Sequence, residues 1–231
     1  MKSKEIPKTL IFGANGFLGR HFFSFYHQFD ADTIGTSHLK EECADLLKPD
    51  LSKLNIKEGE YRYGLITAGI TNIRKCEEDP LGSFKKNVEG VFSLLKQFKE
   101  RGIIPILFSS DYVFDGNKGD YQEEDSLNPL NEYGRQKAFI EQEISNICGQ
   151  EFILLRLAKV FDIRKGSRSL LDEMIQDFYA EKPVRAAYDQ TFSPIFIGDV
   201  IRIVVELQQK SCSGLFNICG SEKWTKIGRA H

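Results

Sequence analysis

Short apolar runs alternate with longer amphipathic stretches along most of the chain. Runs of four to six residues rich in Ile, Leu, Phe, Thr and Tyr, set between turn-forming residues, are typical of buried strands. Their alternation with helical patterns predicts an α/β fold, a doubly wound parallel sheet covered on both faces. The predicted strands are Thr9–Phe12, Thr33–Thr36, Tyr63–Thr67, Ile103–Phe108 and Phe152–Arg156, with a short strand expected just before Asp45.

The stretches between these strands carry apolar residues at helical spacing. In the longest of them, apolar positions recur every three or four residues from Phe84 to Phe98. Ligands of doubly wound sheets bind beyond the carboxyl ends of the strands, so the functional site is expected there. Helices are expected at 17–29, at Leu81–Arg101, around Tyr133 and Lys137 as far as about Cys148, and through Leu207 with Asp199 as N-cap.

Composition narrows the classes of function. The chain has 231 residues, 41% of them hydrophobic, and a mean hydropathy of -0.32, which suits one nucleotide-binding unit with a smaller appendage. The net charge is -2 and the pI is near 6.1, whereas nucleic-acid-binding proteins usually carry an excess of basic residues. No nucleic-acid partner is therefore expected. No apolar run is long enough to cross a bilayer, and the N-terminus leads straight into a strand; we expect a cytoplasmic protein without a membrane partner.

The cysteines and histidines show no metal-binding spacing. Five cysteines are an odd number without a Cys-x-x-Cys pair, and the four histidines are scattered. We therefore expect free, mostly buried thiols and no metal site. The cysteines are Cys43, Cys76, Cys148, Cys212 and Cys219.

A glycine loop follows the first predicted strand and opens the first predicted helix. Gly13 permits a tight turn, Gly16 lets the backbone approach a pyrophosphate, and Gly19 allows close packing of the helix. The helix N-terminus adds unpaired N–H donors and the positive end of a dipole. This spacing is typical of dinucleotide binding, although it also occurs in plain turns between a strand and a helix.

Tyr133 and Lys137 lie four residues apart in a predicted helix and therefore share one face. A nearby ammonium group is expected to lower the pKa of the phenol toward the working range of an acid or base. This pair favours chemistry in which a proton moves while a nicotinamide transfers a hydride.

The residues after the second predicted strand bear on the choice of cofactor. NAD-binding proteins usually place an Asp or Glu there, whereas this chain reads Gly35-Thr-Ser-His-Leu-Lys40. Ser37, His38 and Lys40, with Arg20, are candidates for a 2'-phosphate, so NADP(H) is the preferred prediction and NAD(H) the alternative. His38 and Lys40 also fit an ordinary solvated loop. Asp45 and Leu46 are candidates for contact with the adenine.

Three motifs together resemble the extended short-chain dehydrogenase/reductases, a family of nucleotide-sugar epimerases, dehydratases and reductases. They are the glycine loop, the Tyr-x-x-x-Lys pair, and the serine at the end of the strand near residue 108. Ser110-Asp-Tyr-Val-Phe-Asp-Gly116, Asn128-Pro-Leu-Asn-Glu-Tyr-Gly134, and Asp189-Gln190 followed by Pro194 are most similar to dTDP-4-dehydrorhamnose reductases. The resemblance covers essentially the whole chain and implies a Rossmann-type sheet with a substrate lobe.

The resemblance also implies roles for single residues. Tyr133 would donate a proton to a substrate carbonyl oxygen, Ser110 would hydrogen-bond that oxygen, and Lys137 would hold the nicotinamide ribose. Asn87 would brace the cofactor, although it also fits an exposed helix position, as Ser110 fits a strand-end turn. The expected cofactor contacts are Gly13, Asn15, Gly16, Phe17, Leu18, Gly19, Ser37, His38, Asp45, Leu46, Ala68, Gly69, Asn87, Ser109, Tyr133 and Lys137.

The substrate side departs from the reductase pattern. That subfamily commonly has Arg-Thr-Ser-Trp after the strand ending at Arg156, but this chain reads Arg156-Leu-Ala-Lys159, so a cation replaces an aromatic wall. Basic residues at 164–168 match the geometry of a nucleotide diphosphate, and equally fit a solvated loop. The candidate substrate residues are Asp111, Lys159, Arg164 and Arg168.

Domain limits follow from the same resemblance. Residues 1–158 are expected to form the NAD(P)-binding Rossmann domain, and 159–225 a partial substrate lobe interleaved with the last sheet strands. Related chains usually continue past the segment that begins at Leu215, so we expect C-terminal truncation. The tail, residues 226–231, reads like a translated sequencing adapter and is expected to be non-native.

Three hypotheses about function stay open at this point. The first is an NADPH-dependent reductase of a nucleotide-linked 4-keto-6-deoxy sugar. The second is a nucleotide-sugar epimerase or dehydratase that retains its NAD(P), for which Asp111 alone does not supply the extra acid-base pair of a dehydratase. The third is a non-catalytic NADP-binding regulatory subunit. A homodimer is a further expectation, without a sequence feature that defines its interface.

Overall fold

The computed structural model describes residues 6–30, 32–36, 45–54, 56–164, 172, 176, 178–181 and 191–225. Its main sheet has six strands in the order β2-β1-β3-β4-β5-β9, and every neighbouring pair is parallel. This is the predicted Rossmann-type α/β architecture. The strands are β1 (Thr9–Phe12), β2 (Gly35–Thr36), β3 (Tyr63–Ile66), β4 (Ile104–Ser110), β5 (Ile153–Leu157) and β9 (Gly214–Ile218).

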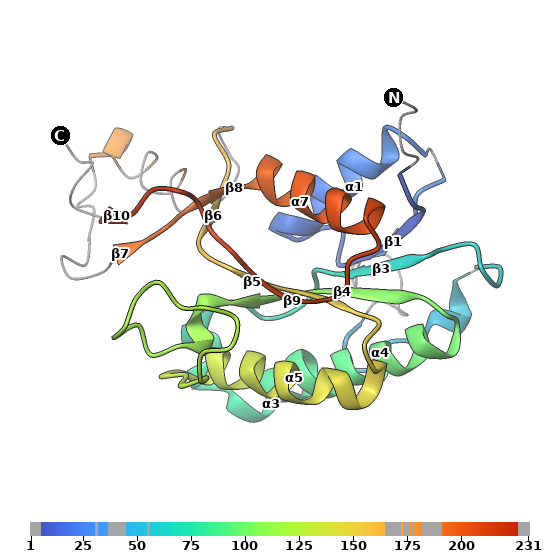
Figure 1. The fold of residues 1–231 in the computed structure, drawn as a ribbon, viewed down its shortest axis with the longest axis horizontal. Coiled ribbons are helices and arrows are strands. Elements are labelled where there is room, and N and C mark those ends of the chain that lie inside the picture. The colour runs from blue at the N-terminus through green and yellow to red at the C-terminus, as the bar shows by residue number, and fades with distance from the viewer. Residues whose placement is uncertain are drawn as a thin grey trace.

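Helices cover both faces of this sheet (Figure 1). One face packs against α1 (Phe17–His27) and α7 (Ile197–Gln209), and the other against α4 (Val91–Glu100) and α5 (Glu132–Cys148). Alternate residues of β1 serve the two layers: Ile11 belongs to the core beneath α1 and α7, and Leu10 and Phe12 to the opposite core. The shorter elements are α2 (Ile73–Glu78), α3 (Pro80–Phe84), η2 (Leu51–Lys53), η3 (Lys85–Gly90) and η4 (Asp111–Val113).

Two small sheets complete the described elements beyond β5. A parallel pair joins β6 (Val160–Phe161) to β8 (Ile195–Phe196), and an antiparallel pair joins β7 (Thr191–Phe192) to β10 (Trp224–Thr225). Both lie on the side of the molecule where β5 ends and where the loop after β4 emerges (Figure 1). β9 and α7, by contrast, complete the main sheet and its cover. The domain boundary near residue 158 stays a prediction.

Two local predictions need correction. The helix expected at Leu81–Arg101 is divided into α3, the π-helical segment η3, and α4, because η3 carries wider backbone turns than an α-helix. Asp199 is not the N-cap of α7: the cap is Phe196, and Asp199 lies in the first turn, where its carboxylate pairs with Arg202 at 3.0 Å. The strand expected before Asp45 falls outside the described residues.

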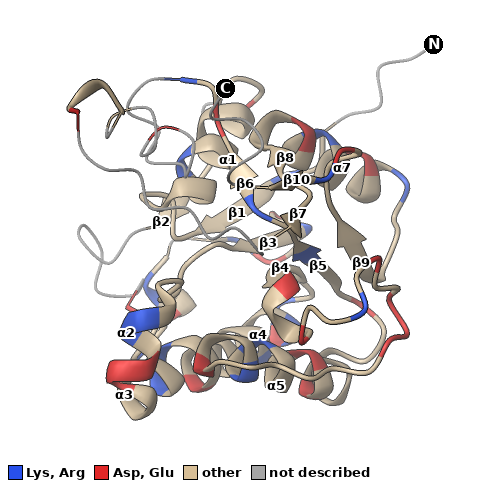
Figure 2. Ribbon diagram, turned by 90° about the vertical axis from the view of Figure 1, so that its left-hand side faces the viewer, with Lys and Arg blue, Asp and Glu red and all other residues tan. Residues whose placement is uncertain are grey.

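The helices α2, α4 and α5 carry charged residues of both signs, as Figure 2 shows. None of the helices that the structure describes is long and apolar enough to cross a membrane. Within the same residues, no group of three or more His, Cys, Asp or Glu side chains is placed to hold a metal ion. Of the cysteines, Cys76 and Cys148 are buried, Cys212 is half-buried and Cys219 is exposed, all as free thiols; Cys43 lies outside the described residues.

Candidate active site

The glycine loop connects β1 to α1 and is packed against the end of β3. Gly13 has a φ of +99°, and a Cβ there would lie 2.5 Å from the backbone nitrogen of Ala68. A Cβ on Gly19 would lie 2.1 Å from the carbonyl oxygen of Gly13, so the helix can approach the loop only with glycine at this position. Both agree with the roles expected from the spacing.

The end of β2 is tied to the same loop. The carbonyl oxygen of Thr36 accepts hydrogen bonds from the backbone N–H groups of Gly13 (3.0 Å) and Ala14 (2.8 Å). Gly16 caps α1 with extended backbone and no side-chain hydrogen bond, so amide groups of the first turn, which includes Phe17, Leu18 and Gly19, remain for a ligand. Asn15 is an exposed residue of the loop.

Ser110, Tyr133 and Lys137 meet beside this loop, at the end of β4. Ser110 is the last residue of β4, and Tyr133 and Lys137 lie on α5, which begins at Glu132 because the Asn131 side chain accepts a hydrogen bond from the Gly134 N–H at 2.8 Å. The Lys137 ammonium lies 5.7 Å from the centre of the Tyr133 ring. The Ser110 hydroxyl lies close enough to Tyr133 to act on the pKa of its phenol. The structure therefore brings the three expected catalytic residues together.

The expected effect of Lys137 on Tyr133 is corrected by the structure. The pKa of Tyr133 is raised, because its phenol is buried and because ionised Asp111, Cys76 and Tyr112 would repel a phenolate; the hydrogen bond with Ser110 opposes the rise. Lys137 directs its ammonium to the Phe108 carbonyl oxygen at 2.8 Å. The phenol is thus held in its protonated form.

Lys137 itself is strongly affected by burial. Desolvation lowers its pKa to about 8, and the negative charge of Glu141 opposes this. Its neighbours Ser109 and Ala68 line the same enclosed cavity of about 10 Å³, close to the size of one water molecule. Among the described residues, the buried Ser109 hydroxyl has no hydrogen-bond partner.

Asp111 and Lys159 form the expected substrate side of the site. The Ser110 hydroxyl donates a hydrogen bond of 2.9 Å to the Asp111 carboxylate. Burial raises the pKa of Asp111, while the Ser110 hydrogen bond and the positive charge of Lys159 oppose the rise. Asp111, which contacts Ser110, therefore lies within electrostatic reach of Lys159.

Arg164 lies against α1. Its guanidinium contacts the Asp162 carboxylate at 2.9 Å and also His21, which is buried on α1. The pKa of His21 is lowered by burial and then by the charge of Arg164. Arg168, Ser37, His38 and Lys40 lie outside the described residues. Arg20 lies with its guanidinium 5.6 Å from the centre of the Phe17 ring.

Four other expected cofactor residues contact neighbouring parts of the chain. Asn87 binds the backbone of Ile70 and is considered in detail below. Asp45 accepts a hydrogen bond of 3.0 Å from the Leu47 N–H, and Leu46 is buried in the core. Gly69 lies next to Asn87, since a Cβ there would be 3.2 Å from the Asn87 Oδ1. Contact of these residues with a cofactor stays a prediction.

Sequence reasoning missed several buried polar residues around the site. Gln136 and Glu141 lie on α5 near Lys137, and Arg156 pairs with Glu141 through two hydrogen bonds of 2.9 and 2.7 Å. His21 and Asp162 are also buried. A polar residue at an apolar position of the helical pattern was the available signal for Gln136 and Glu141.

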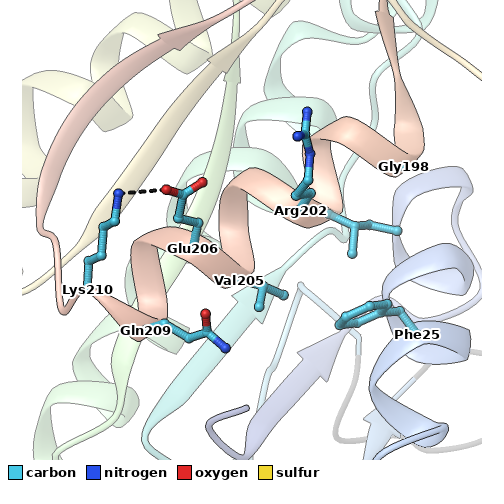
Figure 3. A pocket seen from close by; sticks show the side chains of 8 residues that line it. Phe25, Gly198, Arg202, Val205, Glu206, Gln209 and Lys210 are labelled. Atoms are coloured by element: carbon cyan, nitrogen blue, oxygen red, sulfur yellow. Dashed lines mark hydrogen bonds and ion pairs between the residues drawn. The ribbon is translucent and has the colours of Figure 1, made fainter. Parts of the chain in front are cut away.

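A groove away from these residues lies on the other face of the sheet. It measures about 550 Å³ between α1 and α7, and Figure 3 shows Phe25 of α1 facing the α7 side chains. None of Ser110, Tyr133 and Lys137 lines it. Nothing in the structure shows what covers this groove.

A Rossmann-type sheet, a glycine loop after β1 and a Ser-Tyr-Lys cluster after β4 form an α/β architecture that is typical of dinucleotide-binding proteins. Residues 7–231 match the model of the RmlD substrate binding domain, and the chain belongs to that family.

The chain is also similar to individual proteins and to a solved structure. The chain is 26% identical to methionine adenosyltransferase 2 subunit beta of Mus musculus, over 96% of this chain and 70% of that protein. It is 28% identical to a probable low-salt glycan biosynthesis reductase of Haloferax volcanii, over 94% of this chain and 76% of the other. The crystal structure of a hypothetical dTDP-4-dehydrorhamnose reductase from Sulfolobus tokodaii superposes with a TM-score of 0.80 and 27% identity, over 94% of this chain and 78% of that one.

Proposed function

We propose that the protein is a nicotinamide-dependent reductase of a nucleotide-linked sugar, with a 4-keto-6-deoxy sugar as substrate and NADP(H) as the preferred cofactor. The observation that carries this proposal is the meeting of Ser110, Tyr133 and Lys137 beside the glycine loop and the loop after β3. Similarity to a Haloferax volcanii glycan biosynthesis reductase and to a dTDP-4-dehydrorhamnose reductase structure supports it.

The proposed mechanism uses Tyr133 as the proton donor. A raised pKa keeps the phenol protonated near neutral pH, which is the state needed to deliver a proton to a carbonyl oxygen as it becomes an alkoxide. Ser110 donates a second hydrogen bond to that oxygen after turning from the Asp111 carboxylate, its partner in this structure. The cofactor, when bound, supplies the hydride.

Lys137 and the glycine loop would hold the cofactor. With a pKa of about 8, Lys137 is mainly protonated at neutral pH and can direct donors to a ribose hydroxyl as well as to the Phe108 carbonyl. The first turn of α1 offers amide donors to a pyrophosphate. Preference for NADP(H) rests on the absence of an acidic residue in Gly35-Thr-Ser-His-Leu-Lys40 and on the basic His38 and Lys40.

The substrate side of the proposal rests on charge. Asp111 lies next to Ser110 and within electrostatic reach of Lys159. A cation at 159 suits an anionic or hydroxyl-rich ligand better than an aromatic side chain would. Arg164 and Arg168 are proposed to meet the diphosphate, for which Arg164 would have to exchange its contacts with Asp162 and His21.

The test is to measure the oxidation of NADPH in the presence of a panel of nucleotide-linked 4-keto sugars. The reaction is monitored through the absorbance of the reduced nicotinamide. Tyr133→Phe should lower turnover about 10²- to 10⁴-fold while NADPH still binds. Tyr61→Phe is a matched control, because Tyr61 is also buried but precedes β3, at the opposite end of the strands. Equal turnover in wild type and Tyr133→Phe would refute the proposed chemistry.

A non-catalytic subunit is the second candidate, favoured by the similarity to methionine adenosyltransferase 2 subunit beta. In that case no sugar of the panel would be reduced, and the protein would co-migrate with a methionine adenosyltransferase catalytic chain in size-exclusion chromatography. Cofactor that remains bound through purification, together with redox-neutral turnover, would instead indicate the epimerase or dehydratase alternative.

A further inference from the structure

Gln136 is a buried polar residue between the two α5 residues assigned to catalysis. It lies three positions after Tyr133 and one before Lys137, and only 1% of its surface is exposed. Both polar atoms of a glutamine amide buried this deeply are expected to form hydrogen bonds, because an unpaired amide in the interior costs free energy.

All the hydrogen-bonding groups of this amide have partners. Its oxygen accepts a hydrogen bond of 2.8 Å from the Asn87 Nδ2. Its nitrogen donates to the Ser83 hydroxyl at 2.8 Å and to the Glu132 carboxylate at 3.0 Å. Gln136 therefore joins α5 to α3 through Ser83 and to the π-helical segment η3 through Asn87.

Asn87 carries the connection onward to the loop after β3. Its Oδ1 accepts from the Ile70 N–H at 2.7 Å, and its Nδ2 donates to the Ile70 carbonyl at 2.9 Å. One amide side chain thus pairs with both backbone groups of Ile70, and both hydrogens of its Nδ2 are used when the bond to Gln136 is included.

The loop of residues 68–70, which Asn87 holds through Ile70, also contacts the glycine loop. Ala68 precedes Ile70 by two residues. A Cβ on Gly13 would lie only 2.5 Å from the backbone nitrogen of Ala68, so the two loops are in close contact. Ala68 also lines the small cavity beside Lys137. Hydrogen bonds and close packing therefore run from α5 through Gln136, Asn87 and Ile70 to the glycine loop.

We propose that Gln136 is a positioning residue that fixes the loop 68–70 relative to the Tyr133–Lys137 face of α5, and so sets the geometry in which a nicotinamide nucleotide binds. This inference rests on the proposed function, because it assumes that the cofactor lies between these two parts. Its physical basis is that α5 reaches Asn87 through the hydrogen bond of 2.8 Å from the Asn87 Nδ2 to Gln136. The other side-chain contact of this nitrogen, with the Cys76 Sγ at 3.9 Å, is longer and leads to α2.

Gln136→Met tests the link, because methionine has a similar length and no amide. The variant leaves one hydrogen of the Asn87 Nδ2 without its buried acceptor. We expect the Ile70 amide to exchange with solvent at least about tenfold faster, measured by NMR, and NADPH to bind at least about tenfold more weakly, measured by calorimetry.

Gln208→Met is the matched control. Gln208 is equally buried, at 1% exposure, and its amide accepts from the Tyr26 hydroxyl and donates to the Thr9 hydroxyl, on the other face of the sheet. This variant should lose a similar amount of stability to urea, while Ile70 exchange and NADPH affinity stay within about threefold of wild type.

Gln136→Glu separates the link from stability and serves if Gln136→Met does not fold. It keeps an oxygen acceptor for Asn87 but loses the donor to Ser83 and places a second carboxylate near Glu132. We expect lower stability with Ile70 exchange and NADPH affinity within about threefold of wild type.

Two results would overturn the inference: NADPH affinity unchanged in Gln136→Met, or equal losses in Gln208→Met or Gln136→Glu. Failure of the proposed chemistry is read separately, from equal turnover of wild type and Tyr133→Phe, whereas wild-type protein that binds no nicotinamide nucleotide would overturn both proposals.

Discussion

The Lys137 ammonium donates a hydrogen bond of 2.8 Å to the carbonyl oxygen of Phe108. Phe108 lies within β4, two residues before Ser110, so this bond ties α5 to the strand that ends at the candidate site. The buried lysine has one strong acceptor and a pKa of about 8. Lys137 therefore changes its charge within the pH range in which the protein can be studied in solution.

The first prediction concerns stability and pH. The pKa of Lys137 is about 8 in the folded chain and 10.5 ordinarily, so between these values the unfolded chain binds more protons and stability rises with pH. Relative to Lys137→Met, the free energy of unfolding of wild type should increase by about 1 to 3 kcal/mol from pH 7.5 to about 10.5. Urea unfolding at several pH values measures this difference, and parallel curves for the two proteins would contradict it.

The second prediction separates two glycines of the loop. Gly13→Ala should cost at least about 1 to 3 kcal/mol, because its φ of +99° strains any other residue and the new Cβ would overlap Ala68. Gly16 has a φ of -69°, and a Cβ there would meet only ordinary contacts, the nearest at 3.4 Å.

Gly16→Ala should therefore retain nearly wild-type stability and yet bind NADPH at least about tenfold more weakly, if a pyrophosphate approaches Gly16 closely. Thermal unfolding and calorimetry on the two variants measure both quantities. Unchanged affinity in Gly16→Ala would show that the cofactor does not approach this glycine.

The third prediction concerns the buried ion pair of Arg156 and Glu141, whose side chains are 5% and 2% exposed. Removing one partner leaves a buried charge, so Arg156→Met or Glu141→Leu should each destabilise the protein by about 3 to 5 kcal/mol. The double variant Arg156→Met, Glu141→Leu should cost less than the sum of the two single changes, because neither charge is left alone. Additive losses in urea unfolding would contradict this coupling.

Much of the fold could be predicted because it depends on local pattern. β1, β3, β4 and β5 lie within a residue or two of the predicted runs, since their apolar residues are buried on both faces of a parallel sheet. The glycine loop was predictable for a similar reason: Gly13 and Gly19 are required by steric contacts that the spacing implies.

Features that depend on distant residues could not be predicted. The π-helical segment η3 brings Asn87 to Ile70, a contact across 17 positions in the chain. The pKa of Tyr133 is governed by its burial and by the charge of Asp111. The Tyr-x-x-x-Lys spacing reveals neither of these two causes. The contact of Arg164 with His21 joins residues 143 positions apart.

The last prediction follows from the effect of Asp111 on Tyr133. Ionised Asp111 raises the pKa of Tyr133 by repelling the phenolate, second only to burial. Asp111→Asn removes this charge and keeps an oxygen to accept the hydrogen bond of Ser110, so the pKa of Tyr133 should fall. If Tyr133 donates the proton, turnover is lost as the phenol ionises, and the alkaline limb of the pH-rate profile should move to lower pH in Asp111→Asn. Tyrosinate absorbance, taken as the difference between each protein and its Tyr133→Phe counterpart, should show the same direction of shift. A profile that stays in place while the tyrosinate titration moves would mean that another group donates the proton.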